Sequence, residues 1–194
     1  MKKERKFRIA IFASGNGTNA KAIMEHFQEH PQIEVALVLS NVANAYVLTR
    51  AGHHHVPSRV FDKAQFRDNG EVLRWLQESG ITHIVLAGFL WLVPTGILQS
   101  YPNAIINIHP ALLPKFGGKG MHGSNVHEKV KSMGEKETGI TIHLVNENFD
   151  EGKILFQATC PVETDDSPES IAKKVHALEH AHYPKIIGEW ILSG

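Results

Sequence analysis

The feature that most constrains the fold is the alternation of short apolar runs with helical stretches over the first half of the chain. The run Phe7 to Ala13 is followed by a glycine-containing turn and then by apolar residues at helical spacing. Further apolar runs follow at Ile33 to Leu39, Ile84 to Ala87 and Ala104 to Ile108. Strands written as continuous apolar runs and separated by helices predict a parallel sheet covered on both faces. The expected fold class is therefore α/β, a Rossmann-like, doubly wound, mostly parallel sheet.

The second half of the chain predicts an antiparallel C-terminal extension of that sheet. It opens with a glycine-rich stretch, Pro110 to His122, which reads as a long functional loop. The elements expected after this loop are a helix at Asn125 to Ser132, strands at Ile140 to Val145 and Ile154 to Val162, and a helix that begins at Pro168. Pro184 should kink or end this last helix, because proline lacks the backbone N–H that a helix interior needs.

Charge and cysteine content exclude several classes of protein. Among the 194 residues, 20 Lys and Arg balance 20 Asp and Glu, which argues against a uniformly basic surface for nucleic acid. Cys160 is the only cysteine, so a disulfide framework and a thiolate zinc cluster are excluded. The start, Met1 to Arg8, lacks the features of a signal peptide, and no apolar run has the length of a membrane span. We expect a cytoplasmic protein without nucleic-acid or membrane partners.

The turn Gly15 to Asn19, with the sequence GNGTN, stands between the first strand and the first helix. Backbone N–H groups and the helix dipole converge on an anion at such a place. A dinucleotide site would need a third glycine and an acidic residue after the second strand, where this chain has Ser40 and Asn41. A phosphate monoester is therefore the expected ligand, and an ordinary tight turn is the alternative.

Asn107 and His109 lie where the fifth expected strand ends, and open α/β sheets bind ligands beyond the carboxyl ends of their strands. Strand alternation puts the two side chains on the same side. An amide donor beside an imidazole can stabilise a developing oxyanion and move a proton, as acyl transfer requires. A carboxylate such as Asp150 would raise the imidazole pKa if the fold brought it near. A hydrogen-bonded histidine at a strand end is the alternative.

The other histidines have simpler interpretations. His53, His54 and His55 would point alternately to opposite faces of an extended segment, so no metal site is expected there. His122 and His127 flank the long loop and could reach a substrate, but we interpret them as surface residues. Glu179, on the last expected helix, is either a solvated carboxylate or a group that binds an amine.

Six segments, in order along the chain, resemble the folate-dependent formyltransferases: Ser14 to Asn19, Leu86 to Pro94, Asn107 to Pro114, Gly123 to Glu128, Thr138 to Gly152 and Leu178 to Pro184. The resemblance implies one formyltransferase domain over residues 1–194, with a Rossmann-like part at 7–109 and a folate and active-site part at 110–194. It also implies transfer of the formyl group of 10-formyltetrahydrofolate, a co-substrate, to the glycinamide amine of N1-(5-phospho-D-ribosyl)glycinamide in purine biosynthesis. No metal is implied, and the enzyme would be a monomer or a homodimer.

The resemblance also assigns roles by position. Asn107 and His109 would stabilise the oxyanion, with His109 as proton donor, and Asp150 would keep His109 protonated during direct transfer without a covalent enzyme intermediate. The implied substrate-binding residues are Gly17, Thr18 and Asn19 for the phosphate, with His176 and Glu179 for the remainder and Glu179 near the amine. The implied folate-binding residues are Leu90, Trp91, Leu92, Val93, Asn107, Asn146, Asp150 and Lys63. Trp91 stands where relatives often carry Arg.

Two other functions remain open at this stage. A formyltetrahydrofolate deformylase uses a similar Asn, His and Asp set and gives the formyl group to water. We expect such an enzyme to carry a further N-terminal domain, whereas only Met1 to Lys6 precede the first strand here. A non-catalytic module that binds a phosphate ligand would use the glycine turn alone and would leave Asn107, His109 and Asp150 unexplained.

Overall fold

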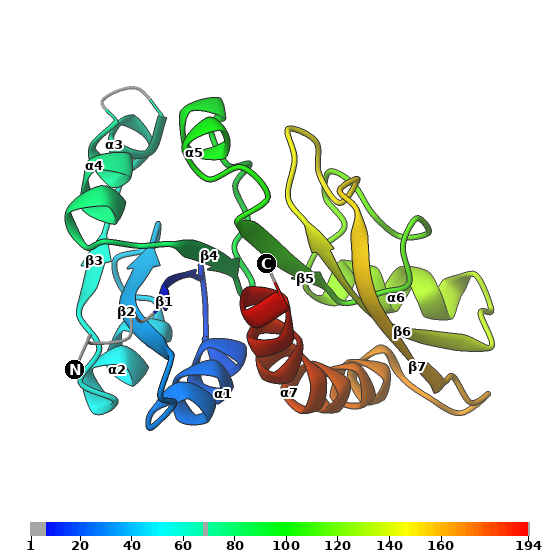
Figure 1. The fold of residues 1–194 in the computed structure, drawn as a ribbon. Coiled ribbons are helices and arrows are strands. Elements are labelled where there is room, and N and C mark those ends of the chain that lie inside the picture. The colour runs from blue at the N-terminus through cyan, green and yellow to red at the C-terminus, as the bar shows by residue number, and fades with distance from the viewer. Residues whose placement is uncertain (1–6, 68–69, 194) are drawn as a thin grey trace.

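A computed structural model describes residues 7–67 and 70–193 (Figure 1); the basic start, Met1 to Lys6, lies outside this range. The strands are β1 Phe7–Phe12, β2 Ile33–Ser40, β3 Ser58–Val60, β4 His83–Leu86, β5 Ile105–His109, β6 Glu137–Leu144 and β7 Ile154–Pro161. They form one sheet in the order β3-β2-β1-β4-β5-β6-β7. The pairs among β1 to β5 are parallel, and β6 is antiparallel to both β5 and β7. The expected mostly parallel sheet with an antiparallel extension is confirmed.

Helices cover both faces of this sheet. They are α1 Thr18–Phe27, α2 Tyr46–His53, α3 Lys63–Arg67, α4 Glu71–Glu78, α5 Thr95–Ser100, α6 Ser124–Ser132 and α7 Pro168–Ser193. Alternation along β1 divides the core: Ile9 and Ile11 pack with apolar residues of α1, α2, α6 and α7, whereas Ala10 and Phe12 pack with those of α3, α4 and α5. The doubly wound arrangement therefore follows from the two-residue period of the buried strands.

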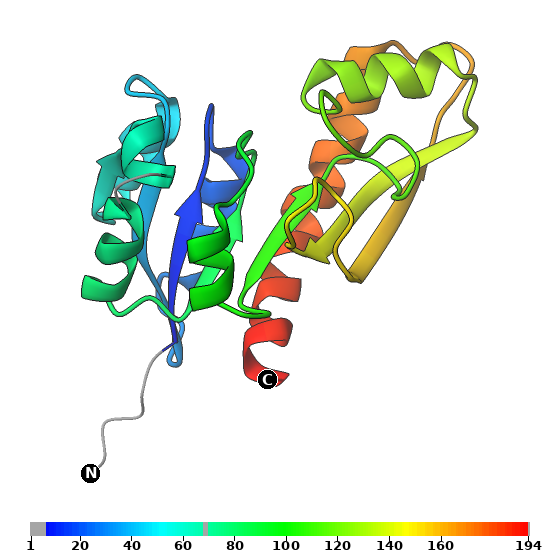
Figure 2. The same cartoon turned by 90° about the horizontal axis from the view of Figure 1, so that it is seen from above.

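The last helix, α7, differs from the expectation at Pro184. It continues through this proline to Ser193, and Figure 2 shows it running from the α6 end of the molecule back along the parallel strands. Pro184 is buried, as are Tyr183 before it and Ile187 and Ile191 after it. The hydroxyl of Tyr183 donates to the carbonyl of Leu86 at 2.8 Å. Packing of the last turns on the sheet offsets the hydrogen bond that proline cannot make.

Three short elements were not expected from the sequence: β3, α3 and α5. All three residues of β3 are exposed, so this edge strand carries no apolar run, and α3 and α5 have only five and six residues. Such short pieces form through tertiary contacts rather than through their own periodicity. Within the described residues, no helix has both the length and the apolar character needed to span a membrane.

Candidate active site

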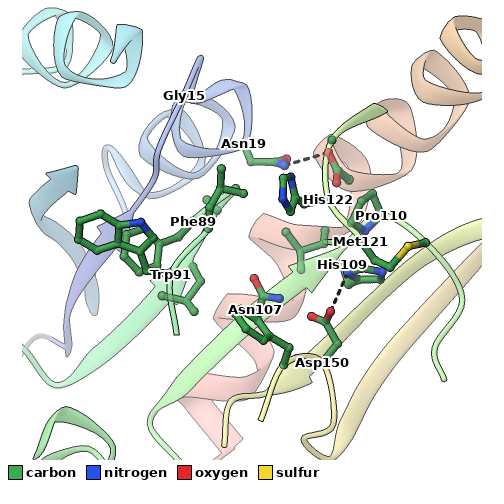
Figure 3. A pocket seen from close by; sticks show the side chains of 18 of the residues that line it. Gly15, Asn19, Phe89, Trp91, Asn107, His109, Pro110, Met121, His122 and Asp150 are labelled. Atoms are coloured by element: carbon green, nitrogen blue, oxygen red, sulfur yellow. Dashed lines mark hydrogen bonds and ion pairs between the residues drawn. The ribbon is translucent and has the colours of Figure 1, made fainter. Parts of the chain in front are cut away.

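A cavity of about 730 Å³ lies beyond the carboxyl ends of β1, β4 and β5 (Figure 3). Its walls are the turn before α1, the segment after β4, the end of β5, the loop before α6, the turn between β6 and β7, and one side of α7. The cavity therefore joins residues as far apart in the chain as Gly15 and Glu179. This is the place where an open parallel sheet binds its ligand.

The glycine turn forms one end of the cavity and leads directly into α1. Gly17 has φ +72°, and a Cβ at this position would lie 2.5 Å from the side chain of Val47, so glycine is required for both conformation and space. Within the described residues, no side chain caps the first turn of α1. Arg50 supports the turn from outside by donating to the backbone carbonyl of Asn16 at 2.8 Å. The first N–H groups of α1 thus remain available to an anion.

Asn107 points into the cavity from β5 and is held by His143 of the neighbouring strand β6. The Nδ1 of His143 donates to the carbonyl of Leu144 at 2.8 Å, because a carbonyl can only accept. Nε2 of His143 lies 3.1 Å from Nδ2 of Asn107, an amide nitrogen that can only donate. One amide hydrogen of Asn107 is left for a ligand. The role of His143 in orienting Asn107 was not expected from the sequence.

His109, two residues further along β5, lies between two acceptors. Its Nε2 donates to the carbonyl of Phe116 at 2.7 Å, and its Nδ1 lies 3.5 Å from Oδ2 of Asp150. Burial lowers the pKa of His109, and this effect outweighs the contributions of Asp150 and Phe116, which raise it. The fold does bring Asp150 to His109, where its negative charge raises the pKa of the ring and partly opposes the larger effect of burial.

Asp150 is placed by the tight turn between β6 and β7. It adopts φ +58°, and its Oδ2 accepts from the backbone N–H of Gly118 at 3.0 Å, which ties the loop before α6 to the site. Gly152 allows this turn to close, since a Cβ there would overlap the carbonyl of Leu144. Burial raises the pKa of Asp150, but contacts with His143, His109 and Gly118 outweigh it and lower the pKa overall. Asp150 is therefore an anion at neutral pH.

Glu179 lies on the cavity side of α7, near the glycine turn. It is only 4% exposed, so the interpretation as a solvated carboxylate is wrong. Its Oε2 accepts from Nδ2 of Asn19 at 2.9 Å and from Nδ1 of His176 at 2.8 Å. This hydrogen bond raises the pKa of His176. The structure thus brings together Asn19, His176 and Glu179, all of which were predicted to bind substrate.

The predicted folate-binding residues are only partly gathered at the cavity. Leu90, Trp91, Leu92 and Val93 line it, together with Asn107 and Asp150. Lys63 and Asn146 do not appear in this lining: Lys63 is an exposed residue of α3, and Asn146 accepts from the backbone N–H of Asn148 within its own turn. Both had been placed by position alone, which does not fix the direction of a side chain.

Several lining residues were missed or misjudged from the sequence. Phe89, beside Trp91, lines the cavity and packs edge-on against the buried Phe12. Lys119 and Met121 line it from the long loop. His122 and His127 also line it, and His127 is only 4% exposed, so the interpretation of His127 as a surface residue is wrong. Its position beside the buried Val126 and three residues before the buried Val130 was the available signal.

Comparison with known families agrees with this geometry. The family model described as "Formyl transferase" matches residues 7–187. The chain belongs to the formyl transferase family. The phosphoribosylglycinamide formyltransferase of Haemophilus influenzae is 35% identical over 193 residues, which cover 96% of this chain and 88% of that protein.

Other members of the family match as well. The chloroplastic phosphoribosylglycinamide formyltransferase of Arabidopsis thaliana is 37% identical over 95% of this chain. This chain spans 65% of the length of that protein and 60% of the length of the Vigna unguiculata protein of the same name. A crystal structure of phosphoribosylglycinamide formyltransferase from Bacillus halodurans has a TM-score of 0.84 at 37% identity and covers 94% of each chain. The fold and the family resemblance inferred from the sequence are both confirmed.

Proposed function

We propose that the protein transfers the formyl group of 10-formyltetrahydrofolate to the glycinamide amine of N1-(5-phospho-D-ribosyl)glycinamide, a reaction of purine biosynthesis. The observation that carries this proposal is one cavity that joins an anion-binding turn to Asn107, His109 and Asp150. A phosphorylated amine needs the anion-binding turn for its phosphate, and the formyl donor must at the same time lie beside Asn107, His109 and Asp150. The names of the relatives described above support a transferase rather than a deformylase.

In this mechanism, the substrate phosphate binds the first N–H groups of α1 at Gly17, Thr18 and Asn19. The folate lies along Leu90 to Val93 and the turn that carries Asp150. This part of the cavity wall suits a pterin ring, because such a ring needs both apolar surface and nearby backbone hydrogen-bonding groups. Binding both substrates in one cavity brings the amine close to the formyl carbon and makes their reaction effectively unimolecular.

The neutral amine nitrogen attacks the formyl carbon, and a C–N bond forms as the carbonyl oxygen becomes an oxyanion. Asn107 and protonated His109 donate hydrogen bonds to that oxygen. The amine then loses a proton, N10 of the folate gains one, and the bond between the formyl carbon and N10 breaks to release tetrahydrofolate. His109 gives its proton to N10 and takes up the proton that the amine releases, so the imidazolium that Asp150 stabilises is restored at the end of each turnover. These bond-forming and bond-breaking steps require no nucleophilic side chain.

The test is the formation of tetrahydrofolate from 10-formyltetrahydrofolate, with and without the ribonucleotide. Removing one oxyanion donor typically costs about 10²–10³ in kcat, so Asn107→Ala and His109→Ala should each lose that much. His53→Ala is a matched control, because His53 is exposed at the end of α2 and outside the cavity lining. Full activity in either cavity variant would refute the assigned roles.

The same assay separates the two alternatives. Turnover without the ribonucleotide would identify a deformylase. No turnover, together with binding of ribose 5-phosphate that survives His109→Ala, would identify a binding module.

Some properties belong to the proposal as expectations. These are one catalytic domain over residues 1–194, a cytoplasmic location, and a monomer or homodimer without nucleic-acid partners. Light scattering and cell fractionation would test the oligomeric state and the location.

A further inference from the structure

A row of three polar residues crosses the last three strands of the sheet at His109. Thr141 of β6 lies directly opposite His109 of β5, and Gln157 of β7 lies directly opposite Thr141. Residues that are opposite one another in paired strands point to the same face of the sheet. Thr141 is polar and yet fully buried, and neither Thr141 nor Gln157 belongs to the lining of the active-site cavity. Their contacts therefore serve the protein rather than the substrates.

The side chains of Thr141 and Gln157 hold both backbone groups of Leu113. The N–H of Leu113 donates to Oγ1 of Thr141 at 3.0 Å, and Nε2 of Gln157 donates to the carbonyl of Leu113 at 3.1 Å. Nε2 of Gln157 also lies 2.8 Å from Oγ1 of Thr141, and this hydroxyl donates to the carbonyl of Ala111 at 2.7 Å. We call Thr141 and Gln157 the Leu113 clamp. The clamp fixes the chain just after β5 has ended.

Leu113 packs against the segment that contacts His109 and Asp150. Its side chain lies so close to Gly117 that a Cβ on this glycine would be 2.6 Å from it. Phe116 has φ +58°, a conformation that residues other than glycine seldom adopt, so it depends on support from its surroundings. The carbonyl of Phe116 accepts from His109, and the N–H of the residue after Gly117 donates to Asp150. A shift of Leu113 would therefore disturb both contacts.

The position of Phe116 bears on which nitrogen of His109 carries the proton in the neutral ring. A carbonyl can only accept, so Phe116, 2.7 Å from Nε2, favours the ring with its proton on Nε2. The carboxylate of Asp150, 3.5 Å from Nδ1, favours the ring with its proton on Nδ1 (Figure 3). The balance between these two forms depends on how firmly the carbonyl of Phe116 is held in place.

We propose that the Leu113 clamp positions the ring of His109 for the transfer reaction. Thr141 and Gln157 are thus positioning residues, which act through Leu113 and the carbonyl of Phe116. The effect on turnover rests on the proposed function, whereas the state of the His109 ring can be measured without any substrate. Because the clamp does not touch the cavity, its loss lowers kcat and leaves KM for both substrates nearly unchanged.

The experiment compares Thr141→Val with Thr141→Ser. Valine keeps the shape of threonine but removes the hydroxyl that contacts Leu113 and Ala111, whereas serine keeps that hydroxyl. We expect Thr141→Val to lower kcat by about 10- to 100-fold, because a small displacement of a reacting group is enough for such a loss. Thr141→Ser should recover most of this activity. NMR of the ring nitrogens of His109 should show the proton moving from Nε2 toward Nδ1 in Thr141→Val and not in Thr141→Ser.

Thr138→Val is the matched control. Thr138 lies on the same strand and is only 2% exposed, and its hydroxyl has no hydrogen-bond partner among the described residues. The same substitution at a similar depth therefore removes no hydrogen bond, so kcat and the His109 ring should match the wild type. Gln157→Met is a second test of the clamp, because Gln157 is exposed on the edge strand β7 and lies outside the core. It should change kcat and the ring in the same direction as Thr141→Val, but by less.

Three results would overturn the inference. One is a wild-type kcat and an unchanged His109 ring in Thr141→Val and Gln157→Met, even with a lower Tm, since the clamp would then only stabilise the fold. Another is an equal loss of kcat in Thr138→Val. The third, if Thr141→Val does not fold, is an unaltered Gln157→Met. A wild type that does not use the ribonucleotide would instead refute the proposed function, and NMR of His109 would still decide whether the clamp holds the ring.

Discussion

Replacing Asp150 by asparagine should shift the pH dependence of the reaction rather than simply lower its rate. The substitution keeps the size of the side chain and an oxygen that can accept from Gly118, but it removes the negative charge 3.5 Å from Nδ1 of His109. Both side chains are nearly buried, at 4% and 11% exposed, so screening by water is weak. At an effective dielectric constant of about 20, two unit charges at this distance interact by about 5 kcal/mol, an upper bound equal to about three and a half pKa units.

The sign of the effect follows from the charge of the protonated ring. Asp150 raises the pKa of His109, so its removal lowers that pKa further below the ordinary value, by about one to three units. At a pH above both pKa values, the protonated fraction of His109, and kcat/KM with it, falls by about 10- to 1000-fold in Asp150→Asn. As the pH falls toward the lowered pKa, the activity of the variant approaches that of the wild type.

The assay measures kcat/KM for Asp150→Asn and for the wild type at each pH from about 5 to 8, the range in which histidines titrate. The ratio of the two values cancels the titration of the substrate amine, which is the same for both proteins. NMR of the His109 ring reports its pKa directly. Asp165→Asn, at an exposed position, should give a ratio near 1 throughout. A ratio for Asp150→Asn that is low but independent of pH would refute the electrostatic role, and so would an unchanged His109 pKa.

Three further substitutions test the turn, the core and the start of α7. Gly17→Ala should lower the free energy of unfolding by about 2–4 kcal/mol and raise KM for the ribonucleotide, because Gly17 has φ +72° and the side chain of Val47 occupies the place of a Cβ. Denaturant unfolding measures the first effect and steady-state kinetics the second. Tyr183→Phe should cost about 1 kcal/mol in urea unfolding, because the buried bond to Leu86 is lost. Asp166→Asn should lower Tm at neutral pH. Hydrogen bonds from Lys174 and Ser170 lower the pKa of Asp166 in the folded state. The difference in Tm between the wild type and Asp166→Asn should therefore be full at pH values above the unfolded-state pKa of Asp166 and should shrink as the pH falls toward its folded-state pKa. A difference in Tm that grew in acid would contradict this prediction.

Much of the site could be predicted because its signals are local. Asn107 and His109 share a face of one strand by simple alternation, and the glycine turn lies between a strand and a helix that are neighbours in sequence. Asp150 was assigned through the resemblance, and the structure then placed its carboxylate beside His109. Each of these residues depends on a motif that a few neighbouring positions define.

The sequence by itself determined the alternation of strands and helices, the polarity of the core and the residue types at the strand ends. Only the tertiary structure decided that His127 is buried in the cavity wall, that Lys63 is exposed outside the cavity lining and that α7 continues past Pro184. It also decided the direction of the His109 pKa shift, which depends on burial as well as on Asp150. The physical reason is that burial, distance and desolvation depend on elements that meet only after the sheet has formed, and no local pattern encodes them.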